Sequence, residues 1–211
     1  MTCIIGYLDR ISHIGYIAGD SMLCNIDVDY QDLVSGAKVF RAMANPKILI
    51  GATTSFRHID LLKYADIFEG LKDPGDLSHA FMVKTVVPRI HDLFGNYWME
   101  ASTDNGANIV VVTPYDIYEI QSDYSVICPM TNYIAVGSGK PYAMASLYTS
   151  DEHPRIHPRT DIDYFTDEPE NRHKWIEDNI IVAMQCAERY AIGVHAPFQM
   201  LRTDGHHRIL D

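Results

Sequence analysis

The sequence predicts a four-layer αββα sandwich of the α+β class, in which two antiparallel sheets are stacked and helices cover their outer faces. Sets of hairpin-connected strands alternate along the chain with helices, which is the order typical of this architecture. The first strands are apolar at consecutive positions, as expected of strands that are covered on both faces. No internal repeat or linker divides the 211 residues, so a single domain over residues 1–211 is expected.

The strands are expected wherever short apolar runs lie between turn-forming residues. They cover residues 2–8, 13–20, 38–44, 48–53, 107–113, 117–121, 125–128, 133–136, 197–202 and 207–210. Tight turns such as Asp204-Gly205 join neighbouring runs as hairpins. Residues 21–37 are acidic and end near Gly36, and they are expected to be irregular.

The helices are expected where apolar residues recur at helical spacing. Thr54 or Ser55 caps a first helix, whose apolar face is expected at Leu61, Tyr64, Ala65 and Phe68. A second helix covers residues 77–94 with its stripe at Val83, Val86, Val87, Ile90 and Phe94, and Pro88 should kink it or divide it in two. Later helices cover residues 141–148 and 174–190, and the polar, proline-rich residues 151–171 between them are expected to form a surface insertion.

Composition excludes several classes of function. The net charge of −11 and the pI near 5.2 argue against an electrostatic nucleic-acid binder. No apolar run approaches the ~18–20 residues that span a bilayer, and no secretory signal precedes the first strand, so a cytoplasmic protein without membrane partners is expected. The four scattered cysteines fit reduced thiols, and neither they nor His153 and His157 match a metal-ligand spacing, so no metal or cofactor is expected.

The start of the chain carries the residue with the most distinctive chemistry. If Met1 is removed, Thr2 presents a hydroxyl nucleophile and an α-amine base on one residue. Asp20 ends the second expected strand and Lys38 begins the third. Ser138 lies in a glycine-flanked turn that enters a helix, where backbone amides can stabilise developing negative charge.

The order of these residues resembles that of the proteasome β-type family of N-terminal-nucleophile hydrolases. The resemblance is greatest to the bacterial ATP-dependent proteasome-like peptidase and its phage-encoded relatives. Five segments carry it, namely residues 2–6 (TCIIG), 17–21 (IAGDS), 37–41 (AKVFR), 48–52 (ILIGA) and 134–143 (IAVGSGKPYA), and the last is the most specific.

The resemblance implies a role for each matched residue. Thr2 would be the nucleophile, Asp20 and Lys38 the ion pair that tunes it, and Ser138 the group that orients the amine or a water. The oxyanion would be held by a backbone N–H near Thr54, where the family prefers glycine. The family often places an acidic residue after its last long helix, and no aspartate takes that place in residues 188–193.

The resemblance implies a ring-forming homo-oligomeric threonine peptidase that cleaves peptides or unfolded proteins, with an ATP-dependent unfoldase as partner. It also implies a cytoplasmic location, in the host cytoplasm if the protein is phage-encoded. The alternative function is a catalytically silent protein that uses the same fold as a self-assembling structural or interaction unit. A third is an amide hydrolase that acts on a small molecule through the same nucleophile.

Overall fold

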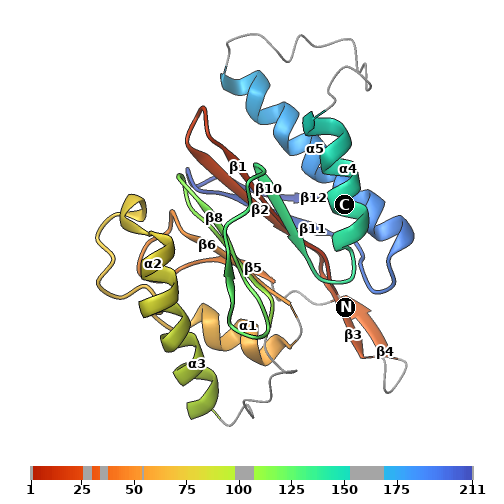
Figure 1. Ribbon diagram of the computed structural model, residues 1–211. Coiled ribbons are helices and arrows are strands. Elements are labelled where there is room, and N and C mark those ends of the chain that lie inside the picture. Colours follow the sequence, from red (N-terminus) through yellow and green to blue (C-terminus); the bar gives the residue numbers. More distant parts are fainter. Residues whose placement is uncertain are drawn as a thin grey trace.

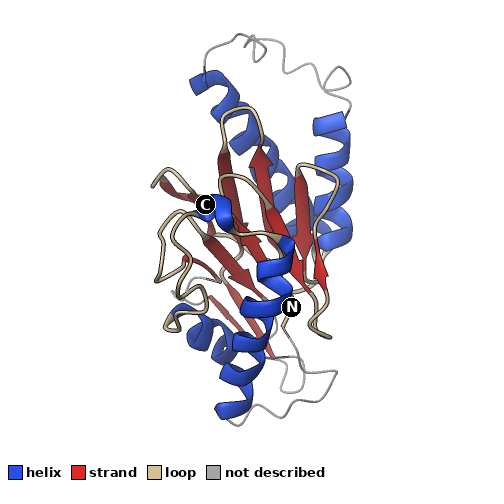
Figure 2. Cartoon of the chain, turned by 60° about the vertical axis from the view of Figure 1, so that its left-hand side comes forward, coloured by secondary structure: helices blue, strands red, loops and turns tan. Residues whose placement is uncertain are grey.

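The computed structural model describes residues 2–25, 30–33, 38–53, 55–97, 107–152 and 169–210. Two sheets of five strands each are stacked, with helices on the two outer faces (Figure 1). The same layers appear from a second direction, where the strands lie between two groups of helices (Figure 2). The predicted α+β sandwich with antiparallel sheets is therefore confirmed.

The first sheet is built around the strand that opens the chain. Its order is β10 (Tyr133–Val136), β1 (Ile4–Asp9), β2 (Ile14–Gly19), β11 (Phe198–Arg202) and β12 (His207–Leu210). All neighbouring strands are antiparallel, and Ile4 of β1 lies opposite Val136 on one side and Gly19 on the other. The start of β1 and the end of β2 therefore meet at one edge of the sheet.

The second sheet is a meander except for the connection through the helices between β6 and β7. Its order is β5 (Val39–Arg41), β6 (Leu49–Ala52), β7 (Ile109–Val112), β8 (Ile117–Ile120) and β9 (Val126–Ile127). A separate two-stranded hairpin contains β3 (Met22–Asn25) and β4 (Tyr30–Leu33), so the expectation that residues 21–37 are irregular is wrong at these strands. The pairing is made by the backbone, and no apolar alternation in the sequence marks it.

The helices form two groups that follow the order of the sequence. On the second sheet lie α1 (Phe56–Lys63), η2 (Pro74–Asp76), α2 (His79–Phe81), η3 (Met82–Val86) and α3 (Val87–Asn96). On the first sheet lie α4 (Lys140–Glu152) and α5 (Pro169–Tyr190). The predicted surface insertion is therefore helical at residues 151–152 and 169–171, and residues 153–168 lie outside the described residues.

The first two predicted helices need correction in their buried faces. Ser55 caps α1 by accepting the Arg57 N–H at 3.1 Å, but α1 buries His58, Ile59 and Leu62 while Tyr64 is 72% exposed. Pro88 divides the second helix as predicted, because η3 is a π-helical segment that ends where α3 begins. The wider π turn shifts the register, so Met82 is buried in place of Val83, which is 44% exposed.

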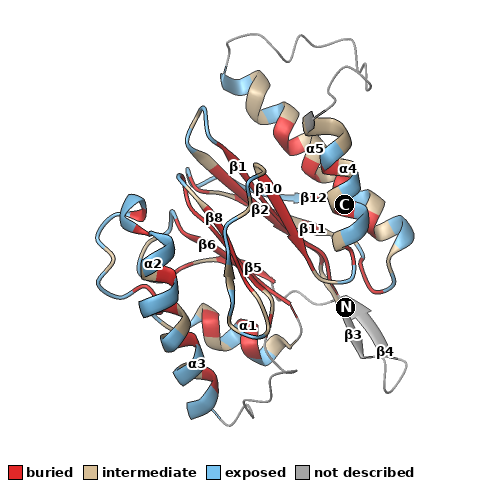
Figure 3. Cartoon of the chain, viewed as in Figure 1, coloured by how far each residue is buried: buried red, intermediate tan, exposed pale blue. Residues whose placement is uncertain are grey.

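Buried apolar side chains form three clusters, and β1 contributes to two of them. Figure 3 shows that most strands of the two sheets are buried, whereas the helices are buried only in part. Ile4 and Leu8 lie between the two sheets, whereas Ile5 and Tyr7 pack toward α4 and α5. Successive side chains of a strand point to opposite faces, so a strand buried on both faces has a continuous apolar run. This alternation also decides where the two residues before β1 direct their side chains.

Candidate active site

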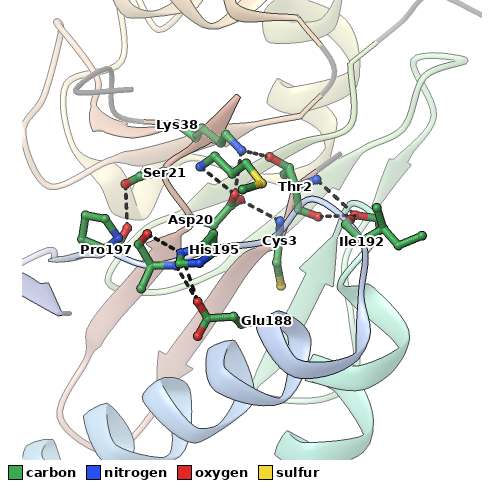
Figure 4. Close-up of polar contacts among 12 residues, drawn as sticks. Thr2, Cys3, Asp20, Ser21, Lys38, Glu188, Ile192, His195 and Pro197 are labelled. Carbon is green, nitrogen blue, oxygen red and sulfur yellow. Dashed lines mark hydrogen bonds and ion pairs between the residues drawn. The ribbon is translucent and has the colours of Figure 1, made fainter. Parts of the chain in front are cut away.

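The structure brings Thr2, Asp20, Lys38 and Ser138 together at one end of the sandwich. Thr2 lies just before β1, and Asp20 follows β2 at the same edge of the first sheet. Lys38 lies just before β5 in the second sheet, and Ser138 lies in the turn between β10 and α4. Figure 4 shows Lys38 and Asp20 reaching the hydroxyl side of Thr2.

Lys38 joins the hydroxyl of Thr2 to the carboxylate of Asp20. Its Nζ donates a hydrogen bond to Thr2 Oγ1 and another to Asp20 Oδ2 at 2.8 Å. All three residues are buried, and a buried ammonium needs such partners to offset its lost hydration. The ammonium can stabilise negative charge on the hydroxyl oxygen, but it has no lone pair with which to act as a base.

Asp20 also fixes the backbone on both sides of the nucleophile. Its Oδ1 accepts the N–H of Cys3 at 2.9 Å, and its Oδ2 accepts the N–H of Met22 at 3.1 Å. Asp20 therefore holds Lys38 and the main chain that carries Thr2 in one arrangement.

Ser138 lies at the backbone of Thr2 rather than at its hydroxyl. Thr2 N donates to Ser138 Oγ at 3.2 Å, and the Gly139 N–H donates to Thr2 O at 3.1 Å. The Ser138 hydroxyl is 3.3 Å from Thr2 O and 3.2 Å from Ile192 O, and its one proton serves one of these acceptors at a time. Ser138 is thus placed to accept the N–H of Thr2.

Gly137 permits the close approach of this turn to Thr2. Its φ of +92° lies in the left-handed region, and a Cβ at this position would be 2.2 Å from the carbonyl oxygen of Thr2. No side chain fits in that space. The glycine next to Ser138 is therefore a geometric requirement of the site.

Cys3 packs its side chain in the core, and its thiol takes no part in the polar contacts that its neighbours make. Strand alternation directs its side chain toward α4 and α5, where it lies in the same apolar layer as Ala187. Burial, followed by the negative charge of Asp20, raises the pKa of the thiol far above its ordinary range, although Lys38 opposes the shift. Cys3 therefore stays protonated.

Two sequence predictions about the site lie outside the described residues. These are the oxyanion donor near Thr54 and the removal of Met1. The neighbouring Thr53 is described, and its N–H donates to Asn108 O at 3.0 Å while its Oγ1 accepts the Asn108 N–H at 3.2 Å. These hydrogen bonds fix the backbone after β6 as far as Thr53, the residue before the oxyanion donor expected near Thr54.

Sequence reasoning missed the contribution of the segment between α5 and β11. The carbonyl of Ile192 meets Ser138, and the carbonyls of His195 and Pro197 accept hydrogen bonds from Ser21. Backbone carbonyls leave no signature in a sequence. In the sequence, the one signal of this contribution was Ser21, which directly follows Asp20 and contacts the segment in the structure.

The described residues contain no group of three or more His, Cys, Asp or Glu side chains that could hold a metal ion. None of the helices described is both long and apolar enough to cross a membrane.

Comparisons with known proteins give a likeness in structure. No family model and no curated protein matches the sequence. Thiobacillus denitrificans BPH in complex with epoxomicin is 18% identical, with a TM-score of 0.66 over 100% of both chains. HslV from Trypanosoma brucei is 18% identical, with a TM-score of 0.61 over 95% of this chain and 98% of that one. Anbu (ancestral beta-subunit) from Yersinia bercovieri is 13% identical, with a TM-score of 0.64 over 100% of this chain and 87% of that one. The fold of this chain is therefore that of the proteasome β-type family.

Proposed function

We propose that the protein is a threonine-type peptidase in which Thr2, exposed as the N-terminal residue by removal of Met1, is the nucleophile. The observation that carries the proposal is the buried contact between Lys38 Nζ and Thr2 Oγ1, with Asp20 as the partner of the ammonium. An ammonium at this oxygen can stabilise the alkoxide that forms when the hydroxyl attacks a carbonyl carbon. The proteasome-type fold supports the same reading, although a fold alone does not fix an activity.

The first half of the proposed reaction forms an ester on Thr2. The free α-amine accepts the proton of Oγ1, directly or through one water, while Oγ1 bonds to the carbon of the scissile peptide. Ser138 Oγ accepts an N–H of that amine and so leaves the nitrogen lone pair for the proton. Lys38 stabilises the developing alkoxide, and a backbone N–H near Thr54 would hold the oxyanion.

The first half is completed when the C–N bond breaks: the α-amine returns its proton to the leaving nitrogen, the C-terminal product is released, and the acyl group remains on Thr2 as an ester. The second half restores the enzyme. Water then attacks the ester and gives one proton to the α-amine, and Thr2 Oγ1 leaves as an alcohol after it regains that proton. Asp20 and Lys38 keep their charges throughout, because neither gives up or gains a proton.

We extend the proposal to the assembly in which the peptidase works. HslV-like neighbours support a homo-oligomeric ring that receives peptides or unfolded protein in the cytoplasm from an ATP-dependent unfoldase. Size-exclusion chromatography with light scattering tests the ring, because a protein of 23.9 kDa would elute as a multiple of that mass. A monomer at micromolar concentration would contradict this part of the proposal.

The activity is tested by intact mass and by covalent labelling. Protein from its native host should lack the mass of Met1 and should gain one equivalent of epoxomicin, the ligand of the BPH complex. Thr2→Ala should abolish the labelling, whereas the matched control Thr149→Ala should not, because that hydroxyl bonds the Ala145 carbonyl of its own helix. Retention of Met1, or labelling that survives Thr2→Ala, would refute the proposal and favour the self-assembling unit.

A further inference from the structure

The segment of residues 191–197, between α5 and β11, supplies three carbonyl groups to the site. Ile192 O lies 3.2 Å from the hydroxyl of Ser138. His195 O accepts the N–H of Ser21 at 3.2 Å, and Pro197 O accepts its hydroxyl at 2.6 Å. Figure 4 shows these contacts on both sides of Asp20 and Thr2. The conformation of this segment therefore affects Ser138, which contacts Thr2, and Ser21, which directly follows Asp20.

Glu188 connects this segment to the last turn of α5. Its Oε1 accepts the N–H of Ala196 at 2.9 Å and lies 3.3 Å from Nδ1 of His195. Of these two residues, His195 supplies one of the carbonyls that accept hydrogen bonds from Ser21, and Ala196 lies between it and Pro197, which supplies the other. A carboxylate that accepts a backbone N–H fixes that peptide plane, and with it the direction of the adjoining carbonyls.

We propose that Glu188 is a positioning residue of the active site, acting through residues 191–197 on Ser21 and Ser138. The inference rests on the proposed function, because it concerns the same nucleophile. When Ile192 O accepts the single hydroxyl proton of Ser138, the oxygen of Ser138 is free to accept an N–H of Thr2. When Ser21 is held at its N–H and its hydroxyl, the carboxylate of Asp20 just before it keeps its direction toward Lys38.

The partial exposure of Glu188 allows its positioning role to be distinguished from a general contribution to the stability of the fold. Its side chain is 29% exposed, so water can replace the carboxylate at the Ala196 N–H when it is removed. The amide oxygen of glutamine can accept the same N–H. Glu177, on the same helix, offers a matched control, because its two oxygens bond Arg202 and Arg208 at 3.2 and 3.1 Å, away from the segment.

The experiment compares Glu188→Ala, Glu188→Gln and Glu177→Ala in the full chain with two readouts. Hydrogen–deuterium exchange reports whether the Ser21 amide is still held by the segment. The limiting rate of epoxomicin labelling at saturation, separate from the half-saturating concentration, reports how well the nucleophile is placed. Thermal denaturation reports stability for each variant.

We expect Glu188→Ala to accelerate exchange at Ser21 and to lower the limiting labelling rate by about ten- to a hundredfold, with little change in half-saturation. Glu188→Gln should restore both quantities, and Glu177→Ala should lower the melting temperature without changing the limiting rate. Unchanged exchange at Ser21, or a changed exchange with an unchanged rate, would overturn the inference. If the wild type is not labelled at all, the proposed function fails, and exchange at Ser21 still decides whether Glu188 holds the segment.

Discussion

Nζ of Lys38 lies 2.8 Å from Oδ2 of Asp20, and the two side chains are 3% and 0% exposed. This is a buried ion pair that also serves the Thr2 hydroxyl and the backbone around it. Removal of one partner of such a pair leaves an uncompensated charge in the interior, which costs more than loss of both charges. Stability and chemistry at this site can therefore be separated by mutation.

The first prediction concerns that pair. Lys38→Met and Asp20→Asn should each lower the free energy of unfolding by about 3–5 kcal/mol, because each removes one partner of a buried ion pair. The double variant should be more stable than the sum of the single effects implies, yet it should remain unlabelled by epoxomicin because Thr2 has lost its ammonium donor. Urea denaturation and intact mass provide the two measurements. A labelled Lys38→Met protein would remove lysine from the mechanism.

The second prediction concerns the glycine beside Ser138. Gly137→Ala should prevent the turn from reaching Thr2, because its Cβ would be 2.2 Å from Thr2 O. Gly205→Ala is the matched control, since that glycine also has a positive φ, +105°, but its Cβ would meet nothing within 4 Å. The control should lose about 1–2 kcal/mol of unfolding free energy from backbone strain alone. Gly137→Ala should lose more and should also lose labelling; equal losses in the two variants would contradict the contact.

The third prediction concerns acid stability at the far end of β1. Burial acts to raise the pKa of Asp9, but hydrogen bonds from Arg172, Ser12 and the Ile11 N–H outweigh it and hold the pKa below its ordinary value. A carboxyl whose pKa is lowered by folding stabilises the protein fully above the pKa of the unfolded chain, about 3.9, and this contribution is lost as the pH falls through the lower folded value. Asp9→Asn should therefore be less stable than wild type at pH 7.

The measurement is the difference in unfolding free energy between wild type and Asp9→Asn as a function of pH. The paired, charge-assisted contacts with Arg172, at 2.7 Å each, are lost in the variant at every pH, because an amide has one acceptor oxygen and no charge, whereas the wild type loses them only in acid. The difference should be constant from pH 7 to about 4 and should shrink below that. A difference that does not shrink in acid would show that shape, and not charge, makes Asp9 important.

The fourth prediction concerns a buried histidine on α1. Burial lowers the pKa of His58. Its ring packs edge-on against the ring of Phe94, with 4.5 Å between the ring centroids, and its Nδ1 has no hydrogen-bond partner among the described residues. The folded protein thus favours the neutral ring, and stability should fall as the pH drops below about 6.5, where the unfolded chain takes up the proton. His58→Phe should flatten this dependence between pH 7.5 and 5.5 in urea denaturation. If the unfolding free energies of wild type and His58→Phe change in parallel with pH, the prediction is refuted.

Much of the fold could be predicted because its signals are local. Consecutive apolar residues marked β1 and β2, and Pro88 marked the division of a helix. The β3–β4 hairpin was missed because no apolar alternation in the sequence marks its two strands. The buried face of α1 was misplaced because the core it meets, including Phe94, lies far along the chain.

The sequence by itself determined which residues could act at the site, because the hydroxyl of Thr2, the charges of Asp20 and Lys38, and the glycines around Ser138 are properties of residue type and order. Only the tertiary structure decided that Lys38 contacts Thr2, that Cys3 faces the core, and that residues 191–197 support the site. The reason is physical. Strand alternation and the stacking of two sheets set the direction of each side chain, and the supporting carbonyls belong to the backbone, which every residue shares.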